Sequence, residues 1–128
     1  MTIKEQCKGL IAHPLFWITD DIELALMTGG CGPGEQGDKL VPDTAWGLSF
    51  KPACIVHDHY YSVGRTMLDK EIADRQFLLN MVTLINRGTV WLRYLRRQRA
   101  MTYYSMVADF GGSSYQRAIE KFESSNPT

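Results

Sequence analysis

The sequence predicts a mainly α-helical fold, and three observations support this prediction. Apolar residues recur at three- and four-residue spacing, capping residues and Gly or Pro mark where such segments begin and end, and strand-like alternation is weak throughout. The chain has 128 residues, of which 45% are hydrophobic, and this is enough to bury a core. Because no repeat, low-complexity stretch or linker divides the chain, we expect a single domain over residues 1–128.

The N-terminal part predicts two short helices and a loop. The first helix covers about residues 2–10. The polar residues 19–21 can cap a second helix that runs through Met27, because their side-chain oxygens accept hydrogen bonds from free backbone amides. A glycine pair stops this helix. Residues 29–41 are rich in Gly and Pro and contain almost no apolar side chains, so we expect them to form a loop.

Two longer helices with clear start signals follow. Pro52 suits the first turn of a helix that runs to about Gly64. Thr66 and Asp69 have the spacing of a capping box that opens the next helix, which residues 86–88 close. The apolar face of this helix consists of Ile72, Leu78, Leu79, Val82 and Ile85. Because the turn between the two helices is short, we expect them to pack antiparallel.

The C-terminal part predicts a long basic helical segment, residues 89–109, and a short last helix over about residues 114–122. The formal net charge is zero, which does not suggest a nucleic-acid partner. Residues 75–108 nevertheless contain six arginines and no acidic residue. Arginines beside Trp and Tyr are typical of a helix on an anionic bilayer, and a core helix with a solvated arginine face is the alternative. The candidate membrane-surface residues are Trp91, Arg93, Arg96, Arg97 and Arg99.

Neither a membrane span nor a signal peptide is predicted. No run of about 18 apolar residues exists, and the N-terminus lacks an apolar stretch of signal-peptide length. We therefore expect a protein that is secreted or translocated by a dedicated route, carried in a virion or released by host lysis, with a cytoplasmic location as the alternative. The three cysteines allow at most one bridge, so the chain is no disulfide scaffold.

Two of the predicted helices carry residues that suit acid–base chemistry. His57 and Tyr61 are four residues apart and share a helix face, whereas Asp58 points about a quarter-turn away. Antiparallel packing would bring Asp74 of the next helix back toward His57. A carboxylate bonded to one ring nitrogen fixes the tautomer and leaves the other nitrogen as a base. The alternative for each of these polar residues is a solvated side chain on a helix surface.

The glycine-rich loop adds a candidate metal site. Residues 29–34 permit backbone conformations that let several carbonyl oxygens converge on one point. Calcium takes six to eight oxygen ligands, so the loop and Asp58 could supply such a set. A plain turn and a phosphate cradle are alternatives, although the lysine and the strand–helix context of a P-loop are absent. Zinc ligation by Cys31, Cys54, His57 and His59 is a further alternative.

Three segments, in this order, resemble the secreted phospholipases A2. Residues 50–61 resemble the catalytic helix, closest to the bacterial and fungal branch with its Pro-Ala-Cys, two residues, His-Asp, two residues, Tyr. Residues 69–81 are similar to that branch's second helix, and also to the Ala-Asp segment of the parvovirus capsid phospholipases. Residues 30–34 look like the calcium loop. The resemblance covers about residues 29–81, less than half of the chain.

The resemblance implies two antiparallel catalytic helices, a calcium loop and calcium-dependent hydrolysis of the sn-2 ester of glycerophospholipids at a membrane surface. It implies that His57 takes a proton from the attacking water, that Asp74 orients the imidazole and that Tyr61 supports Asp74. The implied calcium ligands are the Asp58 carboxylate and the carbonyls of Gly30, Gly32 and Gly34, with the Gly32 N–H at the oxyanion. It also implies a disulfide between Cys31 and Cys54, for which two free thiols are the alternative.

The chain departs from the family pattern in three places. Residues 35–48 form a longer loop, His59 and Tyr60 are bulky neighbours of the site, and the segment between the catalytic helix and Asp74 is short. Two other functions are therefore kept as alternatives. One is a catalytically silent relative that binds lipid or a protein partner. The other is a different metal-dependent hydrolase that uses His57, Asp58 and His59.

Overall fold

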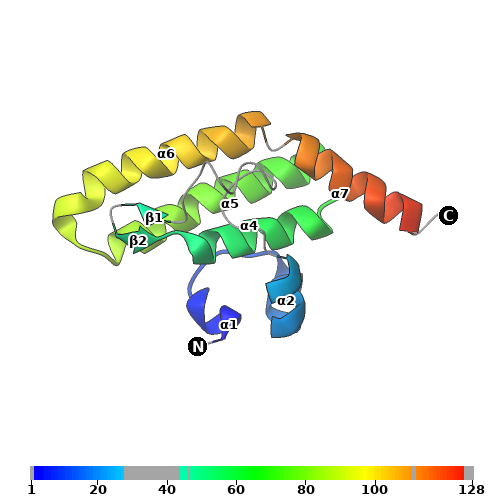
Figure 1. Cartoon of the computed structure of the whole chain (residues 1–128), viewed down its shortest axis with the longest axis horizontal. Helices are drawn as coiled ribbons and strands as arrows, with labels where there is room; N and C mark the ends of the chain where they lie inside the picture. Colours follow the sequence, from blue (N-terminus) through cyan, green and yellow to red (C-terminus); the bar gives the residue numbers. More distant parts are fainter. Residues whose placement is uncertain (1, 28–43, 46, 111, 126–128) are drawn as a thin grey trace.

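The computed structural model describes residues 2–27, 44–45, 47–110 and 112–125, and this part of the chain is mainly helical, as predicted (Figure 1). Helices α4 (Lys51–Val63), α5 (Met67–Asn86) and α6 (Arg93–Phe110) lie side by side. Helix α7 (Gly112–Ser125) follows α6 and contacts both α6 and α4. No helix among the described residues is long and apolar enough to cross a bilayer.

Helices α4 and α5 form an antiparallel hairpin, which confirms the packing expected from their short connection (Figure 1). Pro52 lies in the first turn of α4, where its missing N–H costs no hydrogen bond. The capping box at the start of α5 is also confirmed. Asp69 N donates to Thr66 Oγ1 at 3.0 Å, and Thr66 N donates to Asp69 Oδ2 at 3.2 Å.

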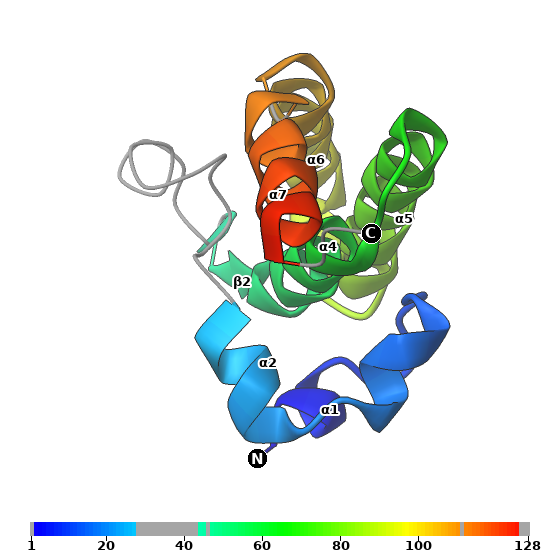
Figure 2. The same cartoon turned by 90° about the vertical axis from the view of Figure 1, so that its right-hand side faces the viewer.

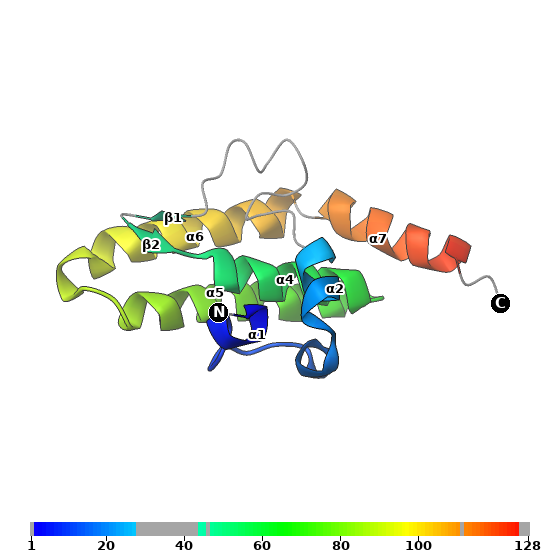
Figure 3. The same ribbon diagram turned by 60° about the horizontal axis from the view of Figure 1, so that its bottom comes forward.

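The N-terminal elements cover α4 on the face away from α6 and α7 (Figures 2 and 3). Helix α1 (Ile3–Gln6) is shorter than the predicted 2–10, because the chain turns at Gly9, whose φ of 86° suits glycine. A 3₁₀ helix, η1 (Pro14–Ile18), was not predicted. Helix α2 (Asp21–Met27) agrees with its predicted bounds, and Asp20 Oδ1 accepts from the backbone N–H of Ile22 at 2.9 Å.

A buried asparagine joins the N-terminal stretch to α5. Asn80 is 1% exposed, and its Nδ2 donates to the backbone carbonyl of Ile11 at 2.8 Å. Ile11 N donates back to Asn80 Oδ1 at 2.8 Å. The amide therefore satisfies both backbone groups of Ile11, as a neighbouring strand would, and fixes this irregular stretch against the helix.

Two short strands form the only departure from the helical architecture among the described residues. Strands β1 (Thr44–Ala45) and β2 (Leu48–Ser49) pair antiparallel, with Thr44 opposite Ser49 and Ala45 opposite Leu48. Gly47, in the connection between them, has a φ of 82°, in the region that favours glycine. Strands of two residues are too short to show alternation, which explains why the sequence did not predict them.

The last predicted helices differ at their ends. The segment 89–109 consists of a 3₁₀ turn, η2 (Val90–Leu92), and α6, and α7 extends beyond the predicted 114–122. A single core lies between the helices. Its buried apolar residues include Leu10, Phe16, Leu24, Phe50, Ala53, Val56, Phe77, Met81, Ile85, Ala100, Tyr103 and Val107.

Candidate active site

His57 lies in the middle of α4 and faces α5. Its side chain is 6% exposed, and its Nε2 is 2.7 Å from Oδ1 of Asp74. Its ring lies 4.2 Å from the ring of Tyr61 and 4.7 Å from that of Phe77, measured between centroids. The imidazole is therefore held on two sides by aromatic rings and at one nitrogen by a carboxylate.

Asp74 is the centre of this network. Its two oxygens receive three short hydrogen bonds, each of 2.7 Å, from His57 Nε2 and Tyr61 Oη at Oδ1 and from Lys70 Nζ at Oδ2. Burial raises the pKa of this carboxyl, but the bonds from His57, Lys70 and Tyr61 outweigh burial, so its pKa is lowered overall. Asp74 is thus ionised at neutral pH and accepts all three bonds.

The bonding pattern assigns the tautomer of His57. Because an ionised carboxylate only accepts hydrogen bonds, Nε2 of His57 carries the proton and Nδ1 is left with its lone pair. Burial lowers the pKa of His57, the bond to Asp74 opposes this effect, and the charge of Lys70 adds to it, with a net lowering. A neutral imidazole with one unprotonated nitrogen can accept a proton, which is the chemistry that a general base requires.

Tyr61 donates its hydroxyl proton to Asp74. Burial, together with the bond to Asp74, raises its pKa far above the ordinary tyrosine value, so the hydroxyl stays protonated. The ring of Tyr61 lies 5.1 Å from the ring of Tyr115 in α7. The Tyr115 hydroxyl in turn donates to the backbone carbonyl of Thr66, in the turn between α4 and α5. Helix α7 therefore supports helices α4 and α5 at their connection.

The structure brings together His57, Tyr61 and Asp74, as predicted from the sequence. It adds Lys70, which was not predicted as a residue of the site. Lys70 is 5% exposed and one helical turn before Asp74. The four-residue spacing from Lys to Asp was visible in the sequence. What the sequence does not show is that this face of α5 is covered by the end of α6.

The implied calcium ligands are only partly within the described residues. Gly30, Gly32 and Gly34 lie outside them, whereas Asp58 is half-buried on α4 beside His57. An Asp carboxylate is an oxygen donor of the kind that calcium prefers, so this residue fits the ion. No group of three or more His, Cys, Asp or Glu side chains that could hold a metal occurs among the described residues. A calcium site completed by backbone carbonyls does not require one.

His59 does not join His57 at a common site. It is 1% exposed, its Nε2 lies 3.4 Å from Thr19 Oγ1, and its ring contacts Phe16 at 5.3 Å between centroids. Burial and the nearby His13 lower the pKa of His59 to about 4, so it remains neutral against the N-terminal elements. In the described part of the chain, this geometry gives no support to metal ligation by His57, Asp58 and His59.

The cysteines are in different states. Cys54, in the first half of α4, is disulfide-bonded, and Cys31, the partner that the resemblance implies, lies outside the described residues. Cys7 is free and buried. Burial and the nearby Asp21 raise the pKa of the Cys7 thiol to about 12, so it is unreactive in the folded protein.

The candidate membrane surface at the start of α6 requires a correction. Trp91 is 91% exposed, as expected. Arg96 is only 6% exposed and lies against Gly88, so the prediction that Arg96 belongs to the membrane surface is wrong. Arg93 Nη2 donates to the backbone carbonyl of Asn86 at 3.0 Å, and Arg97 Nη2 lies 3.4 Å from Asn86 Oδ1. These three arginines gather at the C-terminus of α5, where backbone carbonyls lack partners and the helix dipole favours cations.

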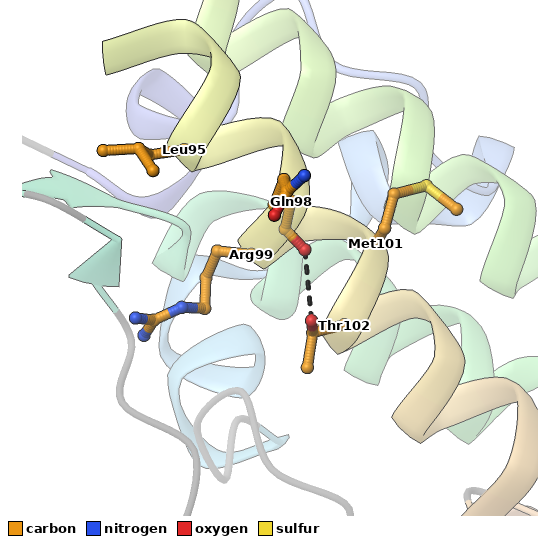
Figure 4. Close-up of a pocket in the computed structure, with 5 residues that line it drawn as sticks. All are labelled: Leu95, Gln98, Arg99, Met101 and Thr102. Atoms are coloured by element: carbon orange, nitrogen blue, oxygen red, sulfur yellow. Dashed lines mark hydrogen bonds between the residues drawn. The ribbon is translucent and has the colours of Figure 1, made fainter.

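Arg99 lies further along α6, at a hollow of about 420 Å³ (Figure 4). The other described residues that line it are Leu95, Gln98, Met101 and Thr102. Figure 4 shows the Arg99 side chain extending away from the helix and Thr102 bonded to the carbonyl of Gln98, at 3.1 Å. These lining residues include no acid–base pair like that of His57 and Asp74, so the hollow is a weaker candidate for an active site.

Comparisons with models of protein families, with curated proteins and with solved structures find no match to this chain.

Proposed function

We propose that the protein is a calcium-dependent phospholipase A2. The observation that carries this proposal is the bond of 2.7 Å between His57 Nε2 and Asp74 Oδ1, with the Tyr61 hydroxyl on the same oxygen. This arrangement leaves Nδ1 of His57 as a base, and it occurs within the segments that resemble the catalytic helices of that family.

The reaction needs a base, a polarised ester and a proton for the leaving group. His57 Nδ1 takes a proton from water as the water oxygen attacks the sn-2 carbonyl carbon, and Asp74 stabilises the imidazolium that forms. The ester C–O bond then breaks, and the imidazolium returns its proton to the departing glycerol oxygen. The products are a fatty acid and a lysophospholipid, and no acyl-enzyme forms because water is the nucleophile.

Calcium would be held by the Asp58 carboxylate with the carbonyls of Gly30, Gly32 and Gly34, and when bound it supplies Lewis-acid stabilisation of the oxyanion. The Gly32 N–H would add a hydrogen bond to the same oxygen. Only oxygen donors enter this set, which suits calcium better than a transition metal.

The proposed reaction is tested with vesicles of mixed-chain phosphatidylglycerol and phosphatidylcholine, in calcium or in EGTA. Mass spectrometry should detect the sn-2 acid only with wild type and calcium. His57→Gln should be inactive, whereas His13→Asn, a matched change of a histidine outside the site, should retain activity. Its amide oxygen can replace His13 Nδ1, which accepts from the N–H of Leu15 at 3.1 Å. No release from either lipid by wild type would reject the proposed reaction and favour the silent lipid-binding relative.

The membrane contact of this enzyme is better placed on the N-terminal elements than on the arginines of α6. Ile18, Ile22 and Leu26 recur every four residues, and they are 78%, 73% and 82% exposed. Such a run of exposed large apolar side chains is uncommon on a soluble surface and is suited to insertion at a bilayer interface. Trp17, 40% exposed, lies next to this run.

Vesicle sedimentation separates the two surfaces. Ile22→Glu should weaken binding to phosphatidylglycerol vesicles by about tenfold or more, because a charge replaces buried apolar area at the interface. Trp91→Ala should have an effect only if α6 also touches the lipid. Equal binding by wild type and Ile22→Glu would refute the contact through α2.

A further inference from the structure

The buried lysine of the site has a complete set of acceptors. Nζ of Lys70 is 2.7 Å from Asp74 Oδ2, 3.1 Å from the backbone carbonyl of Val107 and 3.4 Å from that of Ala108. An ammonium group has three N–H donors, so each donor meets one oxygen. Burying a charge is costly unless it is paired and hydrogen-bonded, and here it is both.

The two carbonyls belong to the last turn of α6, which ends at Phe110. The last four carbonyls of a helix have no partner within it, and a cation is favoured at that end by the helix dipole. Lys70 therefore satisfies the end of α6 and pairs with Asp74 at the same time. It links the catalytic hairpin of α4 and α5 to the third helix of the core.

The consequence for Asp74 is that both of its oxygens are fixed. Oδ1 receives the bonds from His57 and Tyr61, and Oδ2 receives the bond from Lys70. Rotation of a carboxylate about its last side-chain bond is otherwise broad. We propose that Lys70 is a positioning residue of the reaction, whose ammonium holds Asp74 Oδ2 against the end of α6 so that Oδ1 faces His57. This inference rests on the proposed function.

A small cavity beside the ion pair makes the role of the ammonium testable. It has a volume of about 170 Å³ and lies between α5 and α6. Its lining residues are Lys70, Glu71, Asp74, Arg75, Tyr104 and Ala108. A water molecule occupies about 30 Å³ in the liquid, so this space can admit a small alkylammonium ion once the lysine side chain is shortened.

The experiment replaces the ammonium from solution. Lys70→Ala should lower kcat by about 10- to 100-fold and leave KM nearly unchanged. A loss of this size is typical when a group that helps to orient a functional histidine is removed. Ethylammonium chloride should restore kcat with saturation, whereas tetramethylammonium, which has no N–H donor, and sodium chloride should not. Lys70→Met should lose kcat equally and resist rescue, because its side chain fills the space. Lys8→Ala, at an exposed lysine, should behave as wild type.

Thermal unfolding gives a readout that does not need turnover. Ethylammonium should raise the Tm of Lys70→Ala in a concentration-dependent way, and this rise should vanish in Lys70→Ala/Asp74→Asn. If ethylammonium raises the Tm of Lys70→Ala but the wild type hydrolyses no phospholipid, the proposed function is rejected. The ammonium-binding site beside Asp74 is then still supported. Wild-type kcat in folded Lys70→Met, or a kcat of Lys70→Ala that no amine improves, would overturn the positioning role.

Discussion

Asp74→Asn is the substitution that tests the site most directly, because it preserves size and removes one acceptor. In the wild type, two carboxylate oxygens receive three donors at 2.7 Å, from His57, Tyr61 and Lys70. An asparagine offers one oxygen and one NH₂ group, so one of the two positions becomes a donor. No orientation of the amide can satisfy all three neighbours.

Each orientation has a calculable cost. With the amide oxygen toward Lys70, the NH₂ group faces His57 Nε2, which must then accept and carry its proton on Nδ1, so the base is lost. With the oxygen toward His57, the NH₂ group opposes the buried ammonium. We expect the rate to fall about 10³- to 10⁴-fold, the range for a base held in the wrong tautomer. Leaving the lysine charge buried without its partner should reduce the free energy of unfolding by about 3–5 kcal/mol.

Three measurements check this prediction. Initial rates of sn-2 acid release give the loss of activity, urea unfolding gives the loss of stability, and ¹⁵N NMR of the imidazole reports which nitrogen of His57 carries the proton. Asp109→Asn, at an exposed position of α6, is the matched control. An Asp74→Asn protein that keeps its rate within about tenfold and its stability within about 1 kcal/mol would refute the reasoning.

Three further predictions follow from buried polar groups. The pKa of Asp74 is lowered, so the stabilising contribution of its carboxylate is complete above the ordinary aspartate pKa and is lost as pH falls through the lowered value. On acidification below about pH 4, the free energy of unfolding should therefore fall more for the wild type than for Asp74→Asn. Asn80→Ala leaves both backbone groups of Ile11 without partners and should cost about 2–4 kcal/mol by urea unfolding, whereas the control Thr83→Ala should cost about 0.5 kcal/mol or less. Cys7, with its pKa raised to about 12, should resist iodoacetamide at pH 8 until urea unfolds the protein, and rapid alkylation in buffer would show that its burial is incomplete.

Helices α4 and α5 could be predicted from the sequence because their signals are local. Pro52 marks the start of α4, and Thr66 with Asp69 marks the start of α5. The short turn between them leaves antiparallel packing as the favoured arrangement, and this packing places Asp74 against His57. Each of these inferences needs only residues that are close in sequence or one turn that joins two helices.

The role of Lys70 and the burial of Arg96 could not be predicted because they depend on where α6 lies. A lysine four residues before an aspartate is commonly a solvated pair, and only the end of α6 makes it a buried one. Similarly, an arginine in a basic segment is expected on the surface. The C-terminus of α5 offers Arg96 a place beside Gly88, where a side chain larger than hydrogen would collide with the guanidinium at 2.7 Å.

Through the contact of Tyr115 with the turn between α4 and α5, the C-terminal helix stabilises the α4–α5 hairpin. A Cβ at Gly64 would lie 2.7 Å from the Tyr115 hydroxyl, so only a residue without a side chain leaves room for Tyr115 at this turn. Trimming the protein before Tyr115 would open the flank of the Tyr61 ring to water and release the hydroxyl bond to Thr66. Fragments made for functional work should therefore extend through residue 125, and a fusion partner attached there needs a linker that leaves α7 free to dock.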